Sequence, residues 1–239
     1  MNDSRSIIAA FVLGAFLCVG LIGLGYWATQ GALRVKGMER SVTVKGLAER
    51  EAPADIAIWP ITFTDVDNDV ANLYATVERN NARIMDFLAK QGFAAEAIST
   101  SPPAILDRQA QGYSSNDSPF RYTATSTITV YTNDVERVRE ASTQLAELGK
   151  QGITLGGSGM GATAQFLFTG LNDLKPEMIE AATQNAREVA TKFAADSDSK
   201  LGKIRRASQG LFSIEDRDSN TPYIKKVRVV STVEYYLSD

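Results

Sequence analysis

The sequence predicts an α+β fold, with helices packed on an open mixed or largely antiparallel sheet, preceded by one N-terminal transmembrane helix. Three observations support this prediction. Residues 7–33 are 27 consecutive positions without a charge. Segments that alternate apolar and polar residues come in pairs, as strands joined by short turns do. Segments with apolar residues at helical spacing separate these pairs, so the element order is ββαββαββαββ.

The predicted anchor comprises residues 1–33. A bilayer span needs about 20 mostly apolar residues. Eleven residues between Ile7 and Trp27 are Ile, Leu, Val or Phe, and at roughly −0.3 to −0.6 kcal/mol each their insertion gains about 3 to 7 kcal/mol. The side chains expected to face lipid are Ile7, Phe11, Leu13, Phe16, Leu17, Leu21, Ile22, Leu24 and Trp27. A stripe of small residues, which allows close packing against another span, consists of Ala10, Gly14, Cys18 and Gly25.

We expect this anchor to be retained, because it is longer than the apolar centre of a secretory signal and its best cleavage site, Gly23-x-Gly25, is poor. Residues 34–40 form a basic juxtamembrane linker. Its three basic residues outnumber the single Arg5 upstream, so the positive-inside rule taken alone would leave the following domain in the cytoplasm.

Residues 41–239 then form one expected domain. Strands are predicted at 41–49 and 56–64, just after Pro103, and at 121–131, 153–155, 164–169, 204–214 and 226–237. The first helix follows the Asp67–Asp69 segment and ends at Gly92, with an apolar stripe of Val70, Leu73, Val77, Ile84 and Leu88. The second helix spans 133–149. The third begins at Asp173, with a stripe of Ile179, Ala182, Ala186, Val189, Ala190 and Phe193.

Composition excludes several classes of function. The chain contains no histidine, which removes the usual general base near neutral pH and imidazole metal sites. The single cysteine, Cys18, lies in the apolar run, so thiol catalysis and disulfides within the chain are unsupported. A net charge of −3 disfavours a nucleic-acid partner. We expect no enzyme activity, cofactor or metal.

Two motifs resemble ligand sites only in part. Asp65, Asp67 and Asp69 imitate the start of a calcium loop, but Val70 and Thr76 occupy the positions of its glycine and bidentate acid. A helix N-cap explains these aspartates better. Gly157-x-Gly159-x-x-Ala162 matches a dinucleotide fingerprint, but the residues that follow alternate like a strand instead of opening a helix.

Paired carboxylates could hydrolyse a glycoside without histidine, and Asp55, Asp107, Glu215, Asp216 and Asp218 are available. Sequence spacing brings no pair of them together, so surface roles are expected. The tyrosines Tyr122, Tyr131, Tyr235 and Tyr236 are interpreted as ordinary strand residues rather than a stacking platform.

Several segments between residues 41 and 237 resemble the SIMPL domain family, also called DUF541, whose bacterial members are envelope proteins. They include VTVKGLAEREAPADIAI, NNARIMDFLAKQGF with ISTSPPAI, and AATQNAREVATKFAADSDSKLGKI. The similarity is strongest at Gly46, Pro53, Asp55, Gly92, Ile98, Ser99, Thr100 and 201–204. One departure is Ser199-Lys200, where the family often has a further glycine.

This resemblance implies a periplasmic or other extracytoplasmic α+β domain, a link to oxidative or envelope stress, and ring-like self-assembly in some members. It transfers no functional residue. The first hypothesis is therefore a single-pass inner-membrane protein that forms a homo-oligomeric ring or channel-like scaffold, with lipid and itself as partners. Candidate subunit contacts lie in loops 110–119 and 156–161, at Tyr113, Gly157, Gly159 and Gly161.

Two alternatives remain open. The chain could be a tethered monomeric binding module for a peptide or envelope component, whose further partners the sequence does not identify. It could also be a carboxylate-dependent envelope hydrolase, which would need two buried acids facing one cleft.

Overall fold

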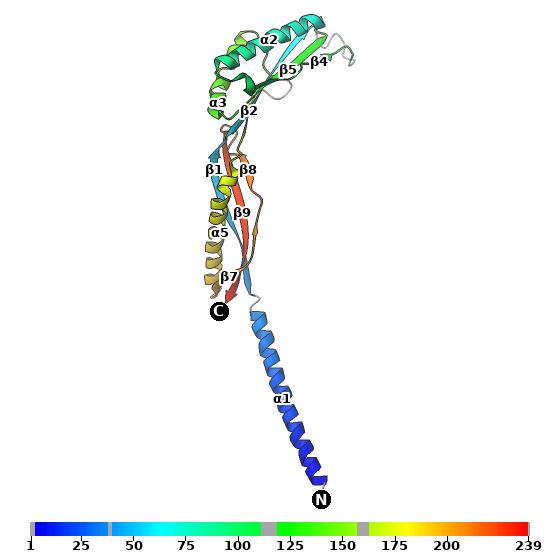
Figure 1. Ribbon diagram of the computed structural model, residues 1–239, viewed down its shortest axis with the longest axis vertical. Coiled ribbons are helices and arrows are strands. Elements are labelled where there is room, and N and C mark those ends of the chain that lie inside the picture. Colours follow the sequence, from blue (N-terminus) through cyan, green and yellow to red (C-terminus); the bar gives the residue numbers. More distant parts are fainter. Residues whose placement is uncertain (1–2, 38–39, 111–118, 157–162, 239) are drawn as a thin grey trace. The chain divides into compact units, whose positions relative to one another are not determined.

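The computed structural model describes residues 3–37, 40–110, 119–156 and 163–238, and within the first helix the side chains of residues 13, 14 and 16–31. The helices are α1 (Asp3–Gly37), α2 (Val70–Lys90), α3 (Val135–Thr143), α4 (Ala146–Lys150) and α5 (Leu171–Asp196), with a 3-10 turn at Ala95–Ala97 (Figure 1). The strands are β1 (Ser41–Pro53), β2 (Ile56–Asp67), β3 (Ile98–Thr100), β4 (Ala104–Asp107), β5 (Tyr122–Thr132), β6 (Gln165–Leu167), β7 (Lys200–Gln209), β8 (Ser213–Asp216) and β9 (Ile224–Ser238).

The strands form two sheets, so the α+β class is confirmed, whereas the expectation of one sheet is wrong. Sheet A has the order β1-β9-β7, with β8 also on β9, and sheet B has the order β3-β5-β2-β6, with β4 also on β5. The chain divides into two compact units. Unit 1 contains residues 1–48, 177–212 and 228–239, and unit 2 contains residues 49–176 and 213–227.

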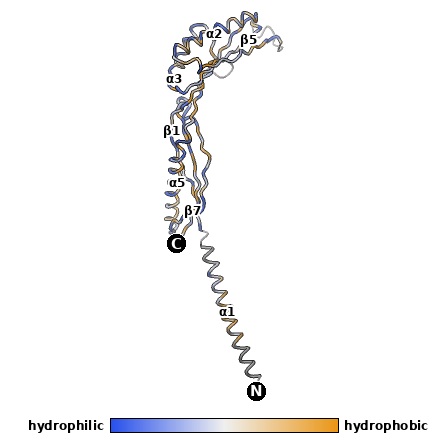
Figure 2. Tube along the Cα trace, viewed as in Figure 1, coloured by the Kyte–Doolittle hydropathy of each residue, from blue (hydrophilic) through white to orange (hydrophobic). Residues whose placement is uncertain are grey.

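Unit 2 is built on the long antiparallel pair of β2 and β5, in which Trp59 pairs with Val130 and Phe63 with Ser126. Alternate residues of these strands are buried, and α2 and α3 pack on that face. Figure 2 shows hydrophobic and hydrophilic residues interspersed along the strands and helices. The resulting core also contains Leu73, Val77, Ile84 and Leu88 of α2, as their helical spacing predicts. Val70 is instead exposed, because it is the first residue of the helix.

Unit 1 has a second core, where α5 packs on β1 and β9. Its buried residues are Val44, Ala186, Ala190, Val233 and Tyr235. The buried side of α5 consists of Met178 followed, at every fourth position, by the small residues Ala182, Ala186, Ala190 and Ala194. The predicted stripe was therefore correct at the alanines and wrong at Phe193, whose side chain is exposed.

Two predicted elements are divided in the structure. The helix expected at 133–149 breaks into α3 and α4, where the hydroxyls of Ser142 and Thr143 donate to the carbonyls of Arg139 and Glu140. Such bonds compete with the helical backbone pattern. The strand expected at 204–214 is two strands, β7 and β8, separated by residues 210–212. Residues 153–155 form no strand, only an isolated bridge between Leu155 and Phe63.

Candidate functional site

Helix α1 contains the predicted anchor residues. The described lipid-facing candidates, from Leu13 to Trp27, are 59–76% exposed, and Gly14, Cys18 and Gly25 are exposed as well. The side chains of Ile7, Ala10 and Phe11 lie outside the described residues. Among the residues that the structure describes, no helix meets both the length and the apolar character of a membrane span.

The candidate subunit contacts cannot be placed, because Tyr113, Gly157, Gly159 and Gly161 lie outside the described residues, as does Ala162 of the dinucleotide-like motif. Arg108 and Gly156, which are described and lie near these segments in the sequence, help to line a groove of about 850 Å³ on sheet B. Most of its other lining residues are threonines, namely Thr62, Thr64, Thr123, Thr125 and Thr154. The groove combines these hydroxyl groups and one guanidinium with the apolar side chains of Ala104, Ile105 and Leu106.

The calcium-like aspartates have structural roles. The carboxylate of Asp69 caps α2 by accepting from the backbone N–H groups of Ala71 and Asn72 at 2.8 and 3.1 Å. Asp67 accepts from the N–H of Asp69, and Asp65 accepts from the Asn80 side chain at 2.9 Å. The three carboxylates point to different partners, and within the described residues no group of acids, histidines or cysteines could hold a metal ion. The N-cap interpretation is confirmed for Asp69.

Asp55, a candidate catalytic acid, also has a structural role, because its carboxylate accepts hydrogen bonds from backbone N–H groups. Its carboxylate accepts from the N–H and hydroxyl of Thr169 and from the N–H of Gly170, at 2.8 to 3.1 Å. These residues immediately precede α5, so Asp55 satisfies N–H groups at the start of that helix. A carboxylate with these partners stabilises the fold.

The remaining candidate acids do not form a catalytic pair. Asp107 forms an ion pair with Arg121 at 2.7 Å, and Asp216 forms one with the buried Lys225. The hydrogen bond from Arg121 lowers the pKa of Asp107, whereas a general acid needs a raised pKa. Glu215 is exposed, and the buried polar side chains of the described chain include no carboxylate. The geometry therefore does not favour the hydrolase alternative.

The four tyrosines lie in two strands, Tyr122 and Tyr131 in β5 and Tyr235 and Tyr236 in β9. Tyr131 is half-exposed, and Arg121 lies over the ring of Tyr122 at 4.8 Å. The guanidinium carbon of Arg205 lies 5.8 Å from the centroid of the Tyr236 ring. Tyr235 is fully buried, and its hydroxyl has no hydrogen-bond partner within the described structure. Their interpretation as strand residues is confirmed for all four, which lie in β5 and β9.

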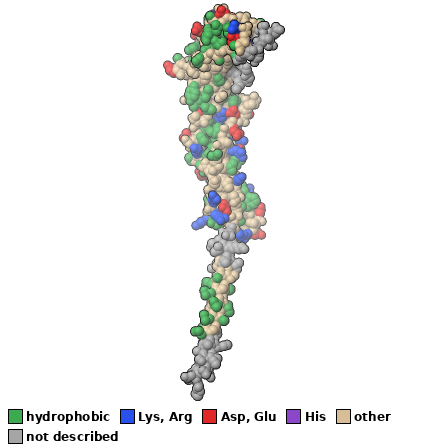
Figure 3. Space-filling view, turned by 90° about the vertical axis from the view of Figure 1, so that its right-hand side faces the viewer, with side chains coloured by type: hydrophobic (Ala, Val, Ile, Leu, Met, Phe, Trp, Pro, Cys, Tyr) green, Lys and Arg blue, Asp and Glu red, His purple; other side chains and the backbone are tan. Residues whose placement is uncertain are grey.

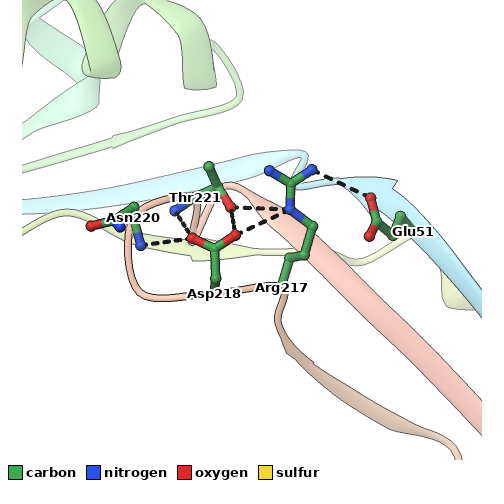
Figure 4. Close-up of polar contacts among 5 residues, drawn as sticks. All are labelled: Glu51, Arg217, Asp218, Asn220 and Thr221. Carbon is green, nitrogen blue, oxygen red and sulfur yellow. Dashed lines mark hydrogen bonds and ion pairs between the residues drawn. The ribbon is translucent and has the colours of Figure 1, made fainter.

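The loop at 217–223 is a feature that sequence reasoning missed (Figure 4). Asp218 accepts from the N–H groups of Asn220 and Thr221, both at 2.8 Å, and from the hydroxyl of Thr221. Arg217 lies between Asp218 and Glu51, at 3.2 and 3.4 Å. The Thr221 hydroxyl, followed by Arg217 and the two N–H groups, lowers the pKa of Asp218 to about 2. The only sequence signal was the turn-forming composition of DRDSN.

Tyr223, at the end of this loop, lines a groove of about 650 Å³. The guanidinium carbon of Arg139 lies 3.7 Å from the centroid of the Tyr223 ring, and Glu136 forms an ion pair with the same arginine. Phe166 meets Tyr223 edge to face at 6.1 Å. Further polar lining comes from Glu140, Thr143, Gln144, Thr163 and Asn220. The groove therefore offers hydrogen-bond donors, acceptors and an aromatic wall.

Comparison with protein families gives one match. The family described as SIMPL, a protein of unknown function (DUF541), matches residues 42–234. Comparison with curated proteins finds no match. Because the family match covers most of the chain, including both sheets and the helices α2 to α5, this protein belongs to the SIMPL (DUF541) family.

Proposed function

We propose that this chain is a membrane-anchored, extracytoplasmic scaffold protein that assembles with copies of itself. The observation that supports the anchor most strongly is the set of large apolar side chains on α1, more than half exposed, within a run of 27 uncharged residues. Leaving such surface in water is unfavourable, at about 25 cal/mol per Å² of apolar area. Lipid would cover it.

The scaffold role is supported by what the family-like residues do. A β-carbon on Gly46 would lie 1.9 Å from the Ala182 carbonyl oxygen, so this glycine allows α5 to approach β1. Gly92 adopts a φ of +83° just after α2, and Asp55 holds the start of α5. Each residue positions backbone. The roles of these three residues support an architectural function.

Self-assembly is supported by open strands. In the described part of sheet A, β1 and β7 are the outer strands, and nearly every residue of β7 is exposed. Unpaired strand edges can receive another strand. Mass photometry of the full-length protein in detergent should show a large particle of uniform mass. A monomer across micromolar concentrations would contradict assembly.

The extracytoplasmic location has its own test. Ser219 is exposed in unit 2, so a Cys18→Ser, Ser219→Cys variant places one reactive thiol on the domain. A membrane-impermeant maleimide should label it in intact spheroplasts. Labelling only after lysis would place the domain in the cytoplasm, as the positive-inside rule taken alone predicts.

The second candidate function is a tethered binding module, and the groove beside Tyr223 favours it. Its volume is in the range typical of ligand sites. Pull-down with the full-length protein should then recover an envelope component. That component should be lost with Tyr223→Ala and kept with Tyr131→Ala, at an exposed position on β5. Recovery that does not depend on Tyr223 would contradict a role for this groove.

A further inference from the structure

Unit 1 brings several chain ends to one place. The N–H of Leu237 donates to the carbonyl of Arg40 at 2.9 Å, the Arg40 guanidinium donates to the Ser199 hydroxyl at 3.1 Å, and Lys200 pairs with Ser238. The start of β1, the start of β7 and the end of β9 therefore meet next to the turn that follows α5. We call the exposed basic and aromatic residues at this end the basal surface, which comprises Arg40, Lys192, Phe193, Lys200, Lys203 and Tyr236.

The basal surface combines positive charge with exposed aromatic rings. Four of its six residues are lysine or arginine, and Arg205 and Arg206 continue the positive charge along β7. Figure 3 shows Lys and Arg side chains recurring over the stretch that β7 and β9 occupy in Figure 1. Among the described residues, the nearby acids are Asp196 at the end of α5, Asp198 in the turn that follows, and Glu234, which is bonded to Ser41 and Arg205. In the sequence, Glu39 directly precedes Arg40 and Asp239 directly follows Ser238. Basic and aromatic residues together are typical of the membrane interface.

Chain length keeps this surface near any membrane that holds α1. Arg40 follows the end of α1 by three residues, which can span at most about 11 Å. The four helical residues after position 33 add about 6 Å. The headgroup layer itself is about 5 to 8 Å thick, and electrostatic attraction reaches about 8 Å further at physiological salt. The basal surface is therefore within reach of lipid phosphates.

We propose that the basal surface binds the anionic phospholipid headgroups of the bilayer that holds the anchor, which fixes unit 1 against the membrane. This inference rests on the proposed anchoring by α1. Lys200 and Lys203 contact the phosphates, and Phe193 and Tyr236 lie at the headgroup level. Each lysine near an anionic surface contributes about fivefold to the equilibrium between the docked and undocked base.

The test uses full-length protein in vesicles of phosphatidylcholine, with or without 30% phosphatidylglycerol. A fluorophore is attached at Ser238→Cys in a Cys18→Ser background, and headgroup-nitroxide lipid quenches it when the base docks. Quenching should be stronger with phosphatidylglycerol and should weaken between 0.05 and 0.5 M salt. Lys200→Gln with Lys203→Gln should lower the ratio of docked to undocked base roughly 25-fold. The matched control, Lys90→Gln with Lys150→Gln, removes the same charge from exposed positions of unit 2 and should have no effect.

The outcomes separate the two proposals. In one outcome the protein floats with both kinds of vesicle, but its quenching does not depend on phosphatidylglycerol or on the two basal lysines. The chain is then anchored without a headgroup-binding surface, and this inference is wrong. Protein that fails to float with either vesicle contradicts the anchor and, with it, this inference.

Discussion

At the scale of single residues, Asp55 joins parts of the chain that lie 114 positions apart. Its carboxylate accepts three bonds from Thr169 and Gly170, and the backbone N–H of Asp55 donates to the carbonyl of Leu167 at 2.9 Å. Both contacts tie the start of β2 to the segment that enters α5. An acid that looks available for catalysis in the sequence is therefore committed to holding two elements together.

Replacing Asp55 by alanine should destabilise unit 2, because two N–H groups at the start of α5 lose their acceptor. Loss of a helix cap costs about 1 to 2 kcal/mol. Urea unfolding in a Trp27→Phe background measures the change, since Trp59, buried in the unit 2 core, is then the only tryptophan. Asp86→Ala, at an exposed position on α2, is the control and should stay within about 0.5 kcal/mol of the parent. Equal stability of the Asp55 and Asp86 variants would contradict the capping role.

Asp218 predicts a pH dependence for its loop. Its pKa in the folded chain is about 2, below the ordinary value of 3.8, mainly because the Thr221 hydroxyl donates to the carboxylate. A lowered pKa means that the stabilisation is fully present above pH 3.8 and is lost as the pH falls toward 2. The carboxyl carbon resonance of Asp218 should titrate in that window. Thr221→Ala should shift the midpoint upward, whereas Ser219→Ala should leave it in place. An unchanged midpoint in the Thr221 variant would show that another contact sets the pKa.

At the scale of elements, α5 packs closely because small residues meet at its contact with β1. Ala182 and Ala186 on the helix lie directly against Gly46 on the strand. A β-carbon at position 46 has no space, so Gly46→Ala must push the helix outward, at a cost of about 1 to 3 kcal/mol for overpacking. Amide exchange in residues 177–196 should then accelerate roughly 5- to 150-fold, as measured by mass spectrometry. Gly149→Ala, where an added β-carbon meets nothing within 4 Å, should not accelerate it.

Elements whose signal lies within a short stretch of sequence could be predicted. The content of Ile, Trp, Phe and Thr at 56–64 predicted β2, which the structure extends to Asp67, and the spacing from Leu73 to Leu88 predicted the buried face of α2. Pairing partners could not be predicted in this way, because alternation shows which side chains are buried and not against which strand. Two sheets therefore appeared where one was expected. The break between α3 and α4 depends on hydroxyl bonds that the apolar stripe does not reveal.

The candidate site was harder to predict than the fold. The contact between Arg139 and Tyr223 joins residues 84 positions apart, and neither has an unusual sequence environment. The acids of the 215–218 segment were noticed, but the partner of Asp216 was not, since Lys225 comes from another strand. Glu51, the second acid beside Arg217, also comes from another strand. Residue type identified the available chemistry, and only the tertiary fold showed that it is used for structure.

At the scale of the whole molecule, charge is distributed unevenly between the two units. Lys and Arg outnumber Asp and Glu in unit 1, which carries α1, and acids outnumber bases in unit 2. A net charge of −3 conceals this asymmetry. The unit attached to the proposed anchor is thus the one that an anionic bilayer would attract. The acidic unit 2 would be repelled from the same surface.

Anchoring by α1 can be tested with substitutions that cancel the free energy gained when the helix inserts into the bilayer. Each arginine at the centre of a span costs about 2.5 to 3.5 kcal/mol, so Leu17→Arg with Leu21→Arg costs about as much as the whole apolar run gains. The wild-type chain should stay in the membrane pellet after alkaline carbonate extraction, and the double variant should move to the supernatant. Leu47→Arg with Leu211→Arg adds the same charge at exposed positions of the domain and should still pellet. Because both variants gain two positive charges, a difference in their extraction reflects the position of the charges, on α1 or on the domain, and not the net charge. Release of the wild type would show that the run does not hold the protein in lipid.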